Sequence, residues 1–208
     1  MESLGGAPRQ AAIVDHFEQM FEKNDDPWHY RRRWYEQRKR ALTLAMLPLA
    51  HYRRAFEPAC ANGELTAALA DRCDALLSCD ASANAVRLAR QRLAGQAHVV
   101  VEQRILPEDW PDGRFDLIVI SEFAYYLPST ALARLLELAC AALTDGGTLL
   151  ACHWRWPIEE WAGPVDSIHR LIGMQPGLHR LAHHEETDML LDVWSTDPRS
   201  VAQMEGLV

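Results

Sequence analysis

The feature that most constrains the fold of this chain is a regular alternation of strand-like and helix-like segments after Pro48. The strand-like segments are short apolar runs, and segments of about ten residues with helical periodicity separate them. Strands that alternate with helices of this length form a parallel sheet with right-handed crossovers. The predicted strands span residues 53–57, 75–79, 97–101, 115–120 and 148–153, and the predicted helices span residues 64–72, 84–94 and 129–143.

The two ends of the chain are less regular than this central part. Residues 1–10 are predicted to be irregular, and apolar spacing predicts helices over 11–23 and from about 28 to 47. After the fifth strand, the pattern predicts a further helix and then a closing antiparallel pair of strands, at residues 161–172, 178–184 and 189–194. We therefore expect one structural unit, with a helical lid over residues 1–48 and an α/β domain over residues 49–208 that holds a mostly parallel, seven-stranded sheet with helices on both faces.

Charge and cysteine content restrict the classes of partner and compartment. The 208 residues hold 21 Lys and Arg against 29 Asp and Glu, a net charge of −8, which argues against nucleic acid as a partner. The five cysteines form no CxxC pair, so we expect reduced thiols. No signal peptide and no apolar run long enough to span a membrane is visible. A cytoplasmic location without membrane association is therefore expected.

The segment from Phe56 to Thr66, which joins the first strand to the first helix, holds the clearest signal of a ligand site. In a parallel α/β sheet, ligands bind outside the carboxyl ends of the strands. The small residues of this segment, Ala59, Ala61 and Gly63, let the backbone approach a ligand closely. An acidic residue, Glu57, begins the segment.

A second acidic residue, Asp80, ends the second predicted strand and is followed by Ala81. A carboxylate at this position can accept hydrogen bonds from both hydroxyls of a ribose. The loop lacks the G-x-G-x-x-G spacing that brings a pyrophosphate to a helix N-terminus, which disfavours a nicotinamide cofactor. Glu57 would repel a phosphate but could receive an ammonium group.

Three segments resemble those of class I methyltransferases. The loop from Glu57 to Gly63 is similar to the E/D-x-G-x-G-x-G pattern of that class, with Ala59 and Ala61 in place of the first two glycines. The stretches 113–122 and 143–150 resemble the fourth-strand segment and the loop before the fifth strand. The resemblance implies a Rossmann-like fold and S-adenosyl-L-methionine as cofactor, with S-adenosyl-L-homocysteine as product. The residues expected to bind the cofactor are Tyr35, Arg38, Glu57, Ala59, Asn62, Gly63, Asp80, Ala81, Gln103, Arg104 and Ser121.

A narrower resemblance to the nodulation protein S family extends from Trp28 to Trp194. Members of that family are N-methyltransferases, and the named member methylates the free amine of a glucosamine oligosaccharide. The resemblance implies a small-molecule amine or sugar as substrate. The sequence leaves open whether the protein forms a homodimer. Its stretches include Asp26-Pro27-Trp28, Trp34-Tyr35-Glu36, Phe56-Glu57-Pro58, Ser121-Glu122, His153-Trp154-Arg155 and Leu191-Asp192-Val193-Trp194.

Glu122 and His153, which follow the fourth and fifth strands, are the predicted catalytic residues. Both are expected to face one cleft, where one of them orients or deprotonates an acceptor amine. The ordinary pKa of histidine suits His153 to this task. His169, on the following helix, is expected to line the same cleft. No metal site is expected, because the segment with His179, His183 and His184 is read as a strand and not as a helix with two histidines one turn apart.

Alternatives to these hypotheses remain open at the level of the sequence. The basic segment 31–40 is either a solvated helix or a lid on which Tyr35 and Arg38, about one turn apart, meet the cofactor carboxylate. The chain could instead be an O-methyltransferase on a hydroxylated metabolite. It could also be a non-catalytic module that binds adenosylmethionine.

Overall fold

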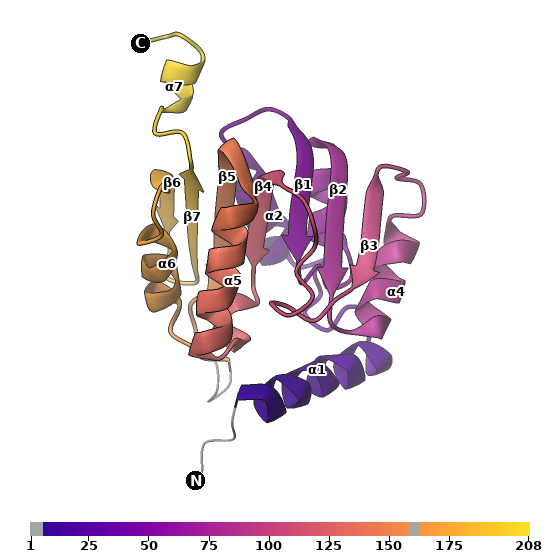
Figure 1. The fold of residues 1–208 in the computed structure, drawn as a ribbon. Coiled ribbons are helices and arrows are strands. Elements are labelled where there is room, and N and C mark those ends of the chain that lie inside the picture. Colours follow the sequence, from indigo (N-terminus) through magenta and orange to yellow (C-terminus); the bar gives the residue numbers. More distant parts are fainter. Residues whose placement is uncertain (1–5, 159–162) are drawn as a thin grey trace.

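The computed structural model describes residues 6–158 and 163–208. A seven-stranded sheet forms the centre of this part of the chain (Figure 1). The strand order is β3-β2-β1-β4-β5-β7-β6. The first five strands are parallel, and β7 is antiparallel to both of its neighbours. The strands are β1 (Tyr52–Pro58), β2 (Cys73–Asp80), β3 (Val99–Gln103), β4 (Phe115–Ser121), β5 (Leu143–Trp154), β6 (His179–Glu185) and β7 (Met189–Ser195). The predicted fold class is confirmed, including the closing antiparallel pair.

Helices cover both faces of the sheet because its central strands are apolar on both sides. On β4, Ile118 and Ile120 pack into the cluster that holds α5 (Ser129–Ala142) and α6 (Val165–Gly173). Leu117 and Val119 face the opposite cluster, which includes residues of α2 (Trp34–Ala45) and α3 (Glu64–Ala70). The remaining helix of this layer, α4 (Ala83–Arg92), packs against Val101 of β3.

The N-terminal helix α1 (Gly6–Lys23) lies across the end of the sheet that contains the carboxyl ends of the parallel strands, as the indigo helix in Figure 1 shows. Glu18 fixes this helix to the start of α4, since its carboxylate accepts hydrogen bonds from Ser82 Oγ and Asn84 Nδ2. Gln10 Nε2 donates to the carbonyl of Leu106 at 2.8 Å. Thus α1 closes the end of the sheet where ligands bind. Among the described residues, none of the helices has the length and apolar character of a membrane span.

Several predicted boundaries were wrong. Helix α2 begins at Trp34 and not at Trp28, because the Asp26 carboxylate accepts from the Tyr30 and Arg31 amides and holds a turn there. Helix α1 begins at Gly6, so residues 6–10 are helical and not irregular. Strand β5 begins at Leu143 and passes through an irregularity in its pairing with β4. The predicted start of the sixth helix at Trp161 lies outside the described residues. The short helices η1 (Ala124–Tyr126) and α7 (Val201–Met204) were not predicted.

The loop between β1 and α3 has an unusual backbone. Ala59, Ala61 and Gly63 have φ angles of 57°, 50° and 82°, so all three adopt the left-handed conformation. The two alanines therefore follow the path that glycines favour, at a steric cost. Gly63 also packs closely on α4, since a Cβ there would lie 3.1 Å from the Ala89 Cα atom.

We predict that Ala59→Gly and Ala61→Gly each raise the free energy of unfolding by about 1 kcal/mol. The reason is that relief of the left-handed strain exceeds the greater entropy of the unfolded glycine chain. The melting temperature should rise by roughly 2–4 °C for a chain of this length. Ala67→Gly, in the interior of α3, is the matched control and should lower stability by roughly 0.5–1 kcal/mol. A loss of stability in the two loop variants equal to that of the control would contradict the prediction.

Candidate active site

A cavity of about 640 Å³ lies at the carboxyl ends of the parallel strands. It is bounded by α1 and α2 and by the segments that follow β1, β2, β3, β4 and β5. The site includes the point where β1 and β4 are neighbours and the strand order reverses, which is where α/β sheets bind ligands. Its volume is within the range of small-molecule sites.

Asp80 organises the cofactor side of this cavity. Its Oδ2 accepts from the Ala61 amide and its Oδ1 from the Ser82 amide, both at 2.9 Å. Burial raises the pKa of this carboxyl, and the amide hydrogen bonds oppose that shift. A carboxylate has about four acceptor positions, so the hydrogen bonds to Ala61 and Ser82 leave capacity for hydroxyl donors in the cavity.

A smaller cavity of about 50 Å³ lies behind the loop and includes Glu57 and Asn62 in its wall. Glu57 accepts from Ser78 Oγ at 2.9 Å, and burial raises its pKa to about 7. The Asn62 side chain donates Nδ2 to the Asp25 carbonyl and to Asp26 Oδ1. Its Oδ1 is buried and has no hydrogen-bond partner among the described residues. This small cavity therefore offers two acceptor groups that an ammonium group could satisfy.

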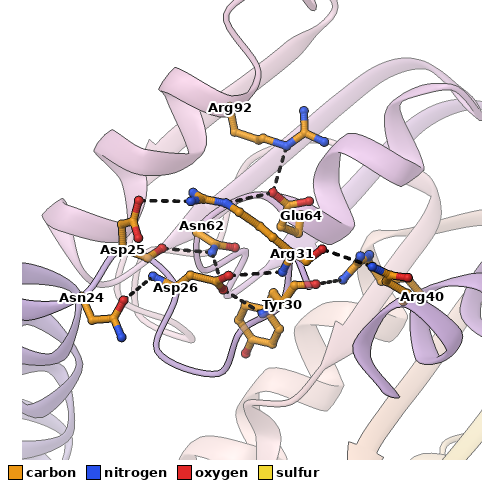
Figure 2. Close-up of polar contacts among 10 residues, drawn as sticks. Asn24, Asp25, Asp26, Tyr30, Arg31, Arg40, Asn62, Glu64 and Arg92 are labelled. Carbon is orange, nitrogen blue, oxygen red and sulfur yellow. Dashed lines mark hydrogen bonds and ion pairs between the residues drawn. The ribbon is translucent and has the colours of Figure 1, made fainter. Parts of the chain in front are cut away.

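Figure 2 shows the polar contacts that hold the α1–α2 linker against this loop. Asp26 accepts from Asn62, and Arg31 pairs with Asp25 at 3.0 Å and with Glu64 at 3.4 Å. Arg40 of α2 donates to the Tyr30 carbonyl at 2.8 Å. These contacts join the linker, the start of α3 and α2 into one wall of the site.

The cavity wall also holds a buried ammonium between two carboxyl groups. Lys39 Nζ lies 2.7 Å from Glu122 Oε1 and 3.0 Å from Glu36 Oε2, and it also lies over the ring of Tyr35 at 5.3 Å. Burial lowers the pKa of Lys39, but the charges of Glu122 and Glu36 hold it well above its usual value. Lys39 therefore stays charged between the two carboxyl groups.

Glu122 is fixed by several donors at once. Its backbone is left-handed, with φ of 59°. Its Oε2 accepts from the Tyr125 hydroxyl at 2.7 Å and from the Trp154 amide at 2.9 Å, while Lys39 occupies Oε1. Glu122 lines the large cavity.

The structure brings half of the predicted site residues to the wall of the large cavity. They are Tyr35, Ala59, Asp80, Ala81, Arg104, Ser121 and Glu122.

The other predicted cofactor residues lie elsewhere, outside the described wall of the large cavity. Arg38 forms a bidentate ion pair with Glu186, at 2.8 and 2.6 Å. Gln103 is exposed and donates to the Ala81 carbonyl. Gly63 serves packing on α4, and Glu57 and Asn62 reach only the small cavity.

The prediction that His153 and His169 face the cleft is wrong. Side chains alternate along β5, and His153 falls on the face that α6 covers, where it is fully buried. Its Nδ1 lies 2.9 Å from His169 Nε2, and His169 Nδ1 lies 2.8 Å from Asp192 Oδ2. Asp192 Oδ1 in turn lies 2.8 Å from His183 Nδ1. Burial holds the pKa of His153 well below its usual range, so this histidine is neutral.

Several lining residues were not predicted from the sequence. Glu36 and Lys39 belong to the basic segment for which a solvated helix was one interpretation, and no local pattern marks them as buried. Further aromatic residues also line the cavity: Phe17, Phe21, Trp28, Tyr30, Phe123 and Trp154. No group of His, Cys, Asp or Glu able to hold a metal ion is found in the part of the chain that the structure describes.

Solved structures of methyltransferases share this fold. A protein from Pseudomonas syringae, provisionally described as a methyltransferase, is 54% identical with a TM-score of 0.70, over 78% of this chain and 99% of that one. The N-methyltransferase NodS from Bradyrhizobium japonicum WM9, in complex with S-adenosyl-L-homocysteine, has a TM-score of 0.79 at 22% identity, over 89% of this chain and 98% of that one.

Sequence relatives give the family. Nodulation protein S from Rhizobium tropici is 33% identical over 115 residues, and that from Sinorhizobium fredii is 31% identical over 114 residues. Each match covers 53% of this chain and 47% or 51% of the relative, so the chain spans about half the length of these relatives. The model of the family Nodulation protein S (NodS) matches residues 10–152, which is more than half of the chain. The chain therefore belongs to the Nodulation protein S family.

Proposed function

We propose that this protein is an S-adenosyl-L-methionine-dependent methyltransferase that methylates the amine of a small polar acceptor such as an amino sugar. The observation that carries the proposal is the Asp80 carboxylate, which holds the left-handed loop after β1 and lines a cavity at the switch point of the sheet. Membership of the Nodulation protein S family and the likeness to solved methyltransferases support it. The choice of an amino sugar rests on the family resemblance.

The residues present fit this cofactor. Asp80 would accept from the ribose hydroxyls, with Ala81 and Arg104 on the nucleoside side. The buried, unpaired Asn62 Oδ1 and the Glu57 carboxylate would receive the ammonium of the methionyl part. When bound, the cofactor supplies a methyl group on a positively charged sulfur.

The chain itself contributes alignment and a dry site. Methyl transfer is an in-line displacement, so the acceptor must be held in one orientation beside the methyl group. Glu122 accepts hydrogen bonds from the Tyr125 hydroxyl and the Trp154 amide, and it thereby fixes the part of the wall that these two residues form. Aromatic side chains from α1 and the linker line the cavity, and with the ligands bound they would exclude water and strengthen the electrostatic interactions there.

We predict that S-adenosyl-L-homocysteine binds the protein and that Asp80→Asn weakens this binding by about 10- to 100-fold. The amide removes the charge from the expected acceptor and presents a donor to the backbone amides. Calorimetric titration measures both affinities. Asp74→Asn, an exposed substitution on the same strand, is the control and should bind as the wild type does. Equal affinity in the Asp80 and Asp74 variants would contradict the assignment.

We predict that this binding releases about half a proton at pH 7. Without ligand, Glu57 is about half protonated at that pH because its pKa is about 7. A neighbouring ammonium favours the carboxylate and lowers that pKa, so affinity should rise from pH 6 to pH 8. Binding heats in buffers with different ionisation enthalpies give the number of protons. Glu57→Gln should abolish the release and Glu137→Gln, on the exposed side of α5, should keep it. Release that persists in Glu57→Gln would refute the role of Glu57.

We predict a structural role for His169. His169→Ala leaves the buried Asp192 carboxylate with fewer partners and should lower the free energy of unfolding by about 2–3 kcal/mol. Affinity for S-adenosyl-L-homocysteine should stay within about threefold. His51→Ala removes an exposed histidine–carboxylate pair and should change stability by less than about 0.5 kcal/mol in urea denaturation. A His169→Ala protein of normal stability would show that the buried array does not support the fold.

A further inference from the structure

Glu36 is a buried carboxylate in the wall of the cavity that has unused acceptor capacity. Glu122 receives three donors, namely Lys39, the Tyr125 hydroxyl and the Trp154 amide. Glu36 receives only Lys39 among the described residues, at 3.3 and 3.0 Å from its two oxygens. Since a carboxylate has about four acceptor positions, Glu36 can accept a further donor without losing a present one.

The surroundings of Glu36 suit a cation. Its side chain is 10% exposed, it lines both cavities, and it lies on the wall where two carboxylates share one ammonium. The Tyr35 hydroxyl, from the adjacent residue, is buried without a hydrogen-bond partner in residues 6–158 and 163–208. The rings of Tyr30 and Tyr35 already face one cation, that of Lys39. A ligand with a cationic donor would satisfy the unused acceptor positions of Glu36.

From this arrangement we infer that Glu36 is a catalytic residue that binds the amine of the methyl acceptor and takes one proton from it. The inference rests on the proposed function. The ammonium gives a proton to the Glu36 carboxylate, which leaves a neutral amine and a carboxylic acid. The nitrogen lone pair then forms the N–C bond while the C–S bond breaks and its electron pair goes to sulfur. The positive charge moves from sulfur to nitrogen, and Glu36 returns its proton to solvent when the product leaves.

Burial favours this proton transfer, and the neighbouring charges modulate it. Desolvation raises the pKa of Glu36. The positive charges of Lys39 and Arg40 lower this pKa, and the charge of Glu122 raises it. A raised pKa of the Glu36 carboxyl is closer to the pKa of an alkylammonium group, so the proton transfer costs less free energy. An alkyl hydroxyl has a far higher pKa, and a carboxylate cannot ionise it. The site therefore selects amines over alcohols.

The test uses the full chain and two matched pairs of probes: D-glucosamine with D-glucose, and 2-phenylethylamine with 2-phenylethanol. Calorimetry first measures S-adenosyl-L-homocysteine binding and then binding of each probe to the saturated protein. Formation of S-adenosyl-L-homocysteine from S-adenosyl-L-methionine measures turnover. The variants are Glu36→Gln, which keeps the shape, Glu36→Asp, which keeps the charge, and the surface control Glu137→Gln, with folding checked by circular dichroism.

We expect at least one amine to bind and react, and neither alcohol. Glu36→Gln should weaken amine binding by about 10- to 100-fold and lower kcat/KM by about 10²- to 10⁴-fold. Glu36→Asp should retain part of both, and the affinity for S-adenosyl-L-homocysteine should stay within about threefold. With this ligand bound normally, three results would overturn the inference: wild-type amine turnover in Glu36→Gln, alcohol turnover equal to that of the amine, or no amine binding and turnover at all. Failure of S-adenosyl-L-homocysteine to bind the wild type would instead refute the proposed function.

Discussion

The site depends on the hydrogen bond between the Asp80 carboxylate and the Ala61 amide. This contact ties the end of β2 to the loop after β1, at 2.9 Å. The second oxygen of the same carboxylate binds the Ser82 amide, beside the start of α4. One buried group therefore positions both turns that border the cavity, and it compensates for the left-handed conformation of Ala59 and Ala61. The acidic group expected to bind the ribose is therefore also the group that holds the loop after β1 in place.

The N-terminal segment completes the cavity, and polar contacts of different strength hold it in place. The ion pair of Lys39 with Glu36 and Glu122 is buried, so removing Lys39 would leave two neighbouring carboxyl groups without a counter-charge. The pair between Arg38 and Glu186 is more exposed, so solvent and salt weaken it more than the buried pair. It does, however, fix α2 against the β6–β7 hairpin. With the linker contacts of Figure 2, these interactions make α1, the linker and α2 a wall of the site and not a separate appendage.

The sequence predicted the sheet because its signals are local. Apolar runs, the small residues at 59–63 and the acid at 80 each mark a strand end or a loop without reference to distant residues. The start of α2 was misplaced because a turn precedes this helix. The Asp26 side chain holds that turn, and hydrophobic periodicity does not report such a contact. His153 was misplaced for a related reason. Alternation along a predicted strand defines two faces, but it does not show which face a later helix covers. Glu36 and Lys39 were missed because their burial depends on Glu122, more than eighty residues away.

A crystal structure of the protein with S-adenosyl-L-homocysteine tests the central claim most directly. The account predicts that both ribose hydroxyls lie within hydrogen-bond distance of the Asp80 carboxylate, with the loop after β1 unchanged and the ammonium beside Asn62 Oδ1. A nucleoside bound away from Asp80, or an Asp80 side chain that leaves the Ala61 amide to admit the ligand, would contradict it.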